Sequence, residues 1–263
     1  MRMIEVNGRG QKVLWQQMRR TELEEASREG AMVIVPVGST EQHGPHLPVD
    51  TDIHIAQEIA LAVARGMDGF RVLVGPPVWC GLSPYHMSFV GTLTLQFQTF
   101  SDLIVDLCSS IVAHGFSKIV LLNGHGGNGA LLNATIIRLS GLKATVAAVT
   151  YWQLIVDELR AIGESELGGV GHACEMETSL ELYLRPELVA KELMVEELRV
   201  PSTSFAGKDF RAPGAVWYVE ANRKPSAHGV YGDPTLASAT KGERIFKAVV
   251  GKLGGFLREF QQL

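Results

Sequence analysis

Apolar positions along the chain follow two different spacings. Short runs rich in Val, Ile and Leu predict strands buried on both faces of a parallel sheet, and helical spacing of apolar residues predicts helices between them. The predicted strands are residues 31–37, 70–74, 118–122 and 144–150. The predicted helices are residues 15–28, 53–65, 100–114, 130–139, 151–162, 180–183 and 236–260. This alternation predicts an α/β fold with a mainly parallel sheet flanked by helices.

Three stretches show neither spacing. Residues 76–92 are irregular, and a loop of this length is uncommon unless it serves a function. Residues 163–171 form a second predicted loop. Residues 186–236 are richer in Pro, Gly and polar side chains, which predicts short strands and loops. We expect this last stretch to lie over a functional site.

The composition fits one globular domain. A chain of 263 residues with 46% hydrophobic content can bury a full core, and we expect a single domain over residues 1–263. The 24 basic and 28 acidic residues give a formal charge of -4, so the charge favours neither nucleic acid nor an anionic membrane as a partner. The expected partner is a small-molecule substrate.

The cysteines and the N-terminus bear on location. The 3 cysteines have neither paired nor C-x-x-C spacing, and their odd number argues against a disulfide framework. Residues 1–11 carry charge and glycine where a signal peptide needs an apolar core, and no apolar run of membrane-spanning length occurs. We therefore expect a cytoplasmic protein.

Three polar clusters fall at or near the ends of predicted strands. They are residues 41–52, 123–128 and 172–177. Because sites in open α/β folds collect at the carboxyl ends of strands, we expect the clusters to meet in one cleft. They are rich in carboxylates and imidazoles, which are ligands for divalent zinc, manganese or iron. The sequence therefore predicts a metal site.

The candidate ligands come from all three clusters. Glu41 and His43 project to the same side if their loop stays extended, and Asp52 can reach back from the start of the next helix. His125 lies between glycines that permit close backbone approach, and Glu175 near a helix start could complete the set. Each has an ordinary explanation too, such as a hydrogen-bonded histidine or a surface carboxylate. Their combination favours the metal.

Two other classes of protein stay open. Gly124, Gly126 and Gly129 match a dinucleotide-binding fingerprint between a strand and a helix, as in a nicotinamide-dependent oxidoreductase. However, residues 146–152 lack the acidic residue expected roughly 20 positions further on. The second alternative is a metal-binding subunit without catalytic activity. A serine hydrolase is not supported, because no G-x-S-x-G motif occurs.

Taken in order, several motifs resemble the creatininase (creatinine amidohydrolase) family. They are GSTEQHGPHLP (38–48), TD (51–52), FVGT (89–92), NGHGGN (123–128), ETS (177–179) and HGVYGDP (228–234). The resemblance implies a Rossmann-like α/β fold, one or two divalent ions, hydrolysis of C–N bonds in amides or cyclic amides, and a homo-oligomer that is frequently a hexamer. It also implies that Glu41, Asp52 and His125 hold one ion, with Asp52 bridging to a second ion held by His43.

The sequence departs from the family pattern in two places. Creatininase carries a carboxylate two residues after its metal-binding histidine, where this chain has Gly127. We expect Glu175 to supply that ligand from another loop, with Glu177 as a supporting group or substitute ligand. An aromatic clamp around the substrate is also missing, because Gly126 and Gly168 stand at its positions. We therefore expect Gly126 to line an enlarged substrate site that suits a molecule larger than creatinine.

Other branches that resemble this version of the motif act on different substrates. They include a formylamino-pyrimidine deformylase, a peptidase that trims the precursor peptide of a redox cofactor, and hydrolases of sugar- or inositol-derived rings. The resemblance thus implies an amide, lactam or formamide substrate, with a cofactor-precursor peptide or such a ring as alternatives within the family.

The predicted chemistry is attack of metal-activated water on an amide or lactam carbonyl. Because an imidazole ordinarily titrates near neutrality, His172 is the predicted proton donor to the leaving nitrogen, a duty that Glu175 or Glu177 could share. Ser83 and His86, in the long loop, are predicted to bind substrate. A hydrogen-bond set that only fastens this loop explains Ser83 and His86 equally well.

Overall fold

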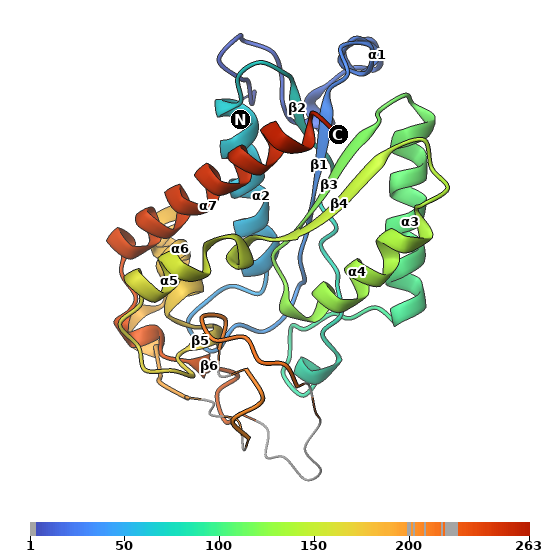
Figure 1. The fold of residues 1–263 in the computed structure, drawn as a ribbon. Helices are drawn as coiled ribbons and strands as arrows, with labels where there is room; N and C mark the ends of the chain where they lie inside the picture. Colours follow the sequence, from blue (N-terminus) through green and yellow to red (C-terminus); the bar gives the residue numbers. More distant parts are fainter. Residues whose placement is uncertain (1–3, 199–200, 202, 208, 217, 219–225) are drawn as a thin grey trace.

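The computed structural model describes residues 4–198, 201, 203–207, 209–216, 218 and 226–263. Its central sheet has the strand order β2-β1-β3-β4, and all neighbouring strands run parallel (Figure 1). The strands are β1 (Met32–Val37), β2 (Val72–Val74), β3 (Lys118–Asn123) and β4 (Thr145–Thr150). The predicted α/β fold with a parallel sheet is therefore confirmed.

Helices cover both faces of this sheet (Figure 1). One face packs against α2 (Thr51–Gly66), α5 (Val156–Ile162), α6 (Glu175–Leu184) and α7 (Ala239–Phe260). The other face packs against α1 (Arg20–Arg28), α3 (Phe97–Ala113) and α4 (Gly129–Arg138). Strand β1 is buried throughout, with Ile34 in the first core and Val33 and Val35 in the second. Burial on both faces explains why the sequence of β1 is almost entirely apolar.

A small second sheet lies beside the carboxyl ends of the parallel strands (Figure 1). It pairs β5 (Val170–His172) with β6 (Tyr231–Gly232) in antiparallel fashion. The prediction of a loop over residues 163–171 was wrong at its end, because β5 gains its hydrogen bonds from a strand distant in sequence. Short 3-10 helices lie at Trp15–Gln17, Pro84–His86, Gly126–Asn128, Tyr151–Ile155, Pro186–Leu188, Lys191–Leu193 and Pro234–Leu236.

Three predicted helices begin well away from the expected residue, and one of them, at 151–162, is a 3-10 helix over Tyr151–Ile155 before α5 begins. The predicted helix at 15–28 is divided, and α1 begins only at Arg20 because the Glu22 carboxylate accepts a hydrogen bond from the Arg19 amide at 2.6 Å. Helix α6 begins at Glu175 rather than at residue 180, and the Glu177 carboxylate accepts from the Cys174 amide at 3.4 Å. This earlier start places two acidic side chains in the first turn of α6.

Close packing at two glycines brings the start of α2 against the sheet. A Cβ atom at Gly38, just after β1, would lie 2.7 Å from the Cα of Ile53. A Cβ atom at Gly124, just after β3, would overlap the carbonyl oxygen of Asp52. Only glycine leaves room for this approach, and the approach holds Asp52 at the carboxyl ends of both strands.

No helix among the described residues is both long and apolar enough to cross a membrane. The cytoplasmic location and the homo-oligomer stay predictions.

The crossing of α6 and α7 provides a test of the packing. A Cβ at Gly242 would overlap the Ser179 carbonyl oxygen, whereas a Cβ at Gly251 on the same helix meets open space. We expect Gly242→Ala to lower the free energy of unfolding by about 1–3 kcal/mol through overpacking. Gly251→Ala should raise it by about 0.5–1 kcal/mol, because alanine favours the helix. Thermal denaturation measures both, and equal stability of the two variants would contradict the close crossing.

Candidate metal centre and active site

Side chains from the three polar clusters meet at the carboxyl ends of the strands. Three overlapping groups have ligand atoms within 4.8 Å of one another: Glu41 with Asp52 and His125, His43 with His172 and Glu177, and Glu41 with His86 and His172. The first cluster lies in the loop after β1 and at the start of α2, the second follows β3, and the third spans β5 and α6. The predicted convergence of the three clusters is confirmed.

His125 presents one ring nitrogen to two carboxylates. Its Nδ1 lies 2.9 Å from Asp52 Oδ2 and 3.2 Å from Glu41 Oε1. Its Nε2 lies 2.9 Å from the carbonyl oxygen of Leu82, which can only accept, so Nε2 carries a proton and donates it. A neutral His125 therefore directs the lone pair of Nδ1 at the carboxylates, which is the arrangement of a metal ligand oriented by a carbonyl group.

His43 repeats this arrangement on the other side of Asp52. Its Nδ1 donates to the carbonyl oxygen of Glu41 at 3.1 Å, and its Nε2 lies 3.1 Å from Asp52 Oδ1. The two oxygens of Asp52 thus face different imidazoles. This is the geometry required of a carboxylate that bridges two ions.

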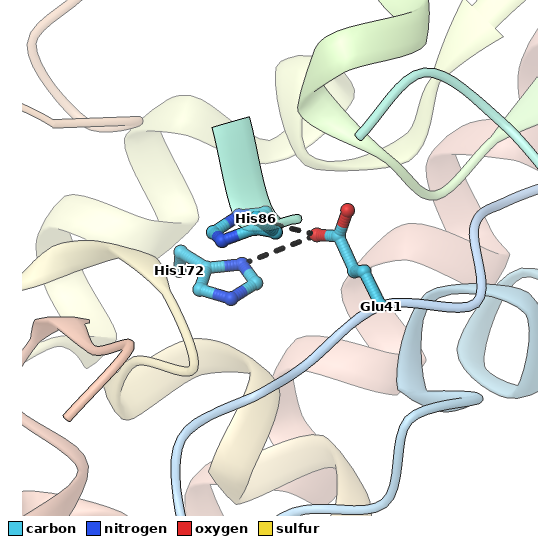
Figure 2. A group of neighbouring side chains, drawn as sticks. All are labelled: Glu41, His86 and His172. Carbon is cyan, nitrogen blue, oxygen red and sulfur yellow. Dashed lines mark ion pairs between the residues drawn. The ribbon is translucent and has the colours of Figure 1, made fainter. Parts of the chain in front are cut away.

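His172 also has its outer nitrogen bound by a carbonyl group, and its other ring nitrogen faces Glu41 (Figure 2). Its Nε2 donates to the backbone oxygen of Gln42 at 2.8 Å, and its Nδ1 lies 3.4 Å from Glu41 Oε1. The Gln42 side-chain amide donates to His86 Nδ1 at 2.8 Å and to the Gly229 carbonyl at 2.9 Å. His86 therefore carries its proton on Nε2, 3.7 Å from Glu41 Oε1.

The backbone between His172 and α6 is strained. Ala173 has a φ of 50°, and it is the one non-glycine residue with positive φ in the described part of the chain. This turn separates the end of β5 from the first turn of α6, so that His172 and Glu177 both face the centre. Strain of this kind persists only where the surrounding structure enforces it, and it is typical of functional sites.

Three carboxylate oxygens of the centre lack hydrogen-bond partners among the described residues. Both oxygens of Glu41 and the Oδ2 atom of Asp52 are buried and accept no hydrogen bond from the described residues. Burying a carboxylate without compensation is strongly unfavourable, so these oxygens need a cation. Oxygen and imidazole donors together suit zinc, manganese or iron. The residues therefore fit the predicted divalent metal.

Without a metal, protons compensate the buried carboxylates. Burial disfavours the charged form of His43, but Asp52 and then Glu177 and Glu41 outweigh this and raise the pKa of His43 to about 10. Burial raises the pKa of Glu177 to about 7. Burial, reinforced by the neighbouring His43 and His86, instead holds the pKa of His172 well below its usual value. Burial likewise disfavours the charged form of His125, but Glu41 and Asp52 outweigh this and hold the pKa of His125 well above its usual value. Metal binding would have to displace protons from His43, His125 and Glu177.

The structure does not bring Glu175 to the centre, so its predicted role as a metal ligand and catalytic group is not supported. Its carboxylate pairs with Lys241 Nζ at 2.5 Å and accepts from the backbone amides of Glu164 and Ser165 at 3.0 Å. Glu175 and Glu177 lie two positions apart on α6, and such residues point to different sides of a helix. Glu177, predicted as a substitute ligand, faces the centre instead.

The glycines after His125 differ in their surroundings. A Cβ at Gly127 would overlap the Leu82 carbonyl oxygen and the Tyr85 hydroxyl group, so no side chain fits there. Gly126 is exposed, and a Cβ there would meet nothing within 4 Å. The space beside Gly126 is therefore open, and the role of Gly126 in lining a substrate site stays a prediction.

Ser83 and His86 are buried beside the other residues of the centre. Ser83 Oγ lies 2.6 Å from Ser39 Oγ, and its amide donates to Thr94. His86 is bound by Gln42. These contacts match the loop-fastening alternative, and substrate binding by Ser83 and His86 stays a prediction.

Two residues at the site were not singled out from the sequence. The side chain of Gln42 orients His86, and the hydroxyl of Tyr85 lies 3.2 Å from His125 Nε2. Gln42 stands inside the densest polar motif, between Glu41 and His43, which was a usable signal. Tyr85 has no such signal, since aromatic residues in loops are common.

Comparisons with known proteins agree with this geometry. The family model described as creatininase, creatinine amidohydrolase, matches residues 16–257. The mycofactocin precursor peptide peptidase of Mycolicibacterium smegmatis is 35% identical over 236 residues, which cover 88% of this chain and 85% of that protein. The 3-dehydro-scyllo-inosose hydrolase of Thermotoga maritima is 30% identical over 268 residues, which cover 95% of this chain and 84% of that protein.

Solved structures show the same fold. The structure "Creatininase Mn" matches with a TM-score of 0.77 and 25% sequence identity, over 94% of this chain and 98% of that chain. The matches in sequence and in structure both extend over most of the molecule, as the resemblance of the motifs predicts. The chain therefore belongs to the creatininase family and is an amidohydrolase of that family.

Proposed function

We propose that this protein hydrolyses a C–N bond of an amide at the centre formed by Glu41, His43, Asp52, His125 and Glu177. The observation that carries the proposal is the set of unpartnered oxygens on Glu41 and Asp52, which face lone pairs of oriented imidazoles. Glu41, Asp52 and His125 would hold one ion, and His43 and Glu177 would hold a second, with Asp52 between them. When bound, a divalent cation acidifies water and polarises the amide carbonyl.

His172 moves the proton in this proposal. Because Nε2 donates to the Gln42 carbonyl, the lone pair of Nδ1 faces the centre and can accept a proton from the attacking water. The water oxygen bonds to the carbonyl carbon, and the π electrons move to the carbonyl oxygen. When these electrons form the carbonyl double bond again, the C–N bond breaks. The electron pair left on the nitrogen then takes the proton from Nδ1 of His172. The products are a carboxylic acid and an amine.

The open space beside Gly126 supports a substrate larger than creatinine. The peptidase that is 35% identical to this chain favours a short peptide as the second candidate substrate, after lactams and formamides. The inosose hydrolase supports a ring substrate less strongly, at 30% identity. Manganese and zinc are the metals to test first, because the matched structure "Creatininase Mn" names manganese and imidazole-rich sites suit zinc.

The proposed activity and its metal can be tested together. Protein reconstituted with manganese or zinc should hydrolyse at least one member of a panel of lactams, formamides and short peptides, and chelation should abolish the activity. Glu41→Gln keeps the shape of the side chain but loses its charge, so we expect bound metal to fall and turnover to drop by at least about a hundredfold. Glu25→Gln on the exposed face of α1 is the matched control. Full activity of Glu41→Gln would refute the assigned centre.

The two acidic residues in the first turn of α6 should behave differently. Glu177→Gln should lose one metal equivalent and most activity. Glu175→Gln should keep metal and activity but melt at a lower temperature, because Lys241 would lose its buried partner, at a cost of roughly 3–5 kcal/mol. Metal analysis and calorimetry of both variants separate the roles. Loss of metal in Glu175→Gln with unchanged stability would restore the original ligand prediction.

The width of the site depends on Gly126. Because a Cβ fits there without contact, Gly126→Ala should be close to neutral. Gly126→Phe should raise KM for a peptide by about tenfold, which corresponds to roughly 1.4 kcal/mol of lost binding free energy. KM for a small formamide should change little. Steady-state kinetics with both substrates checks this. An equal effect on the two substrates would argue against Gly126 as a determinant of size.

A further inference from the structure

The Tyr85 side chain is exposed to solvent and also contacts His125, a residue of the proposed metal centre. Its exposed fraction is 56%, yet its hydroxyl group reaches inward to within 3.2 Å of His125 Nε2. The ring packs edge-on to His86 at 4.7 Å between centroids and nearly parallel to His125 at 6.3 Å. The glycine at position 127 makes room for the hydroxyl group, because a Cβ there would overlap it.

The hydroxyl proton of Tyr85 has no acceptor among the described residues. His125 Nε2 is the one described atom in hydrogen-bond reach of the hydroxyl oxygen. That nitrogen must itself carry a proton, because it lies 2.9 Å from the Leu82 carbonyl oxygen, which only accepts. Tyr85 can therefore accept from His125 but cannot donate to it. A tyrosine hydroxyl that is turned inward normally finds a partner, so this proton is available to a ligand.

We propose that Tyr85 is a catalytic residue that donates a hydrogen bond to the carbonyl oxygen of the substrate. The proposal rests on the proposed amide hydrolysis. As water adds to the carbonyl carbon, the π electron pair becomes a lone pair on that oxygen, and the Tyr85 O–H bond points a dipole at the growing negative charge. The phenol keeps its proton, and the electron pair returns when the C–N bond breaks. A donor aimed at developing charge stabilises the transition state more than the bound substrate.

Tyr85→Phe tests this donor without removing the ring. The packing against His86 and His125 persists in this variant, so a purely structural role predicts unchanged kinetics. The matched control is Tyr183→Phe, which removes a hydroxyl from another exposed tyrosine, one that packs against Phe246 on α7. Both variants are compared with the wild type as full-length, metal-loaded protein, after metal analysis has shown equal occupancy.

Two measurements decide the outcome. We expect Tyr85→Phe to lower kcat by about a hundredfold and to change KM little, as for the loss of one oxyanion donor. We also expect methylphosphonate, a tetrahedral oxyanion, to bind this variant about tenfold more weakly in calorimetric titration, because a hydrogen bond to a charged group is lost. Tyr183→Phe should match the wild type in both measurements.

Failure of this proposal can be distinguished from failure of the proposed function. If the wild type hydrolyses no member of the panel, the hydrolase activity is contradicted, and the methylphosphonate titration alone then decides the role of Tyr85. If the wild type is active and Tyr85→Phe has the same kcat and the same affinity for methylphosphonate, Tyr85 is not a donor to the substrate.

Discussion

Backbone carbonyl groups control the chemistry of this site, because they decide which nitrogen of each imidazole keeps its proton. The carbonyls of Glu41, Gln42 and Leu82 accept from His43, His172 and His125, respectively. Each histidine is thereby left with an inward lone pair beside a buried carboxylate. The lone pair and the carboxylate repel each other unless a proton or a metal cation lies between them. The orientation of these backbone carbonyl groups thus makes binding of a cation favourable at the centre.

Hydrogen bonds between distant segments keep these backbone carbonyls in place. Asn128 accepts from the Leu82 amide and donates to the Gly38 carbonyl, so it joins the long loop to the end of β1. Arg185 pairs with Asp50 just before α2 and with the buried Glu181 on α6. The two elements that carry Asp52 and Glu177 are therefore joined by a charge network that is buried at Glu181 and half exposed at Asp50. Losing the partner of the buried Glu181 is strongly disfavoured.

The sequence predicts the sheet well, because the strands are buried on both faces and show it in near-continuous apolar runs. Strands β1 and β4 begin one residue after their predicted starts. The ligand set was harder to predict, because it depends on contacts between segments far apart in sequence. Lys241, 66 residues away, pairs with Glu175, and the start of α6 leaves Glu177 on the side of the centre. Strand β5 likewise depends on β6 near the end of the chain.

Gly127, which stands where the family pattern has a carboxylate, is part of the packing that orients His125. A side chain at position 127 would displace the Leu82 carbonyl, and Nε2 of His125 would then lose the acceptor that fixes its proton. Once glycine stands there, the loop containing Leu82 and Tyr85 can close onto His125, and the negative charge must come from another element. In the proposed centre, Glu177 on α6 would meet that need beside His43 and His172. The space beside Gly126 is open as well, which supports the proposal of a larger substrate.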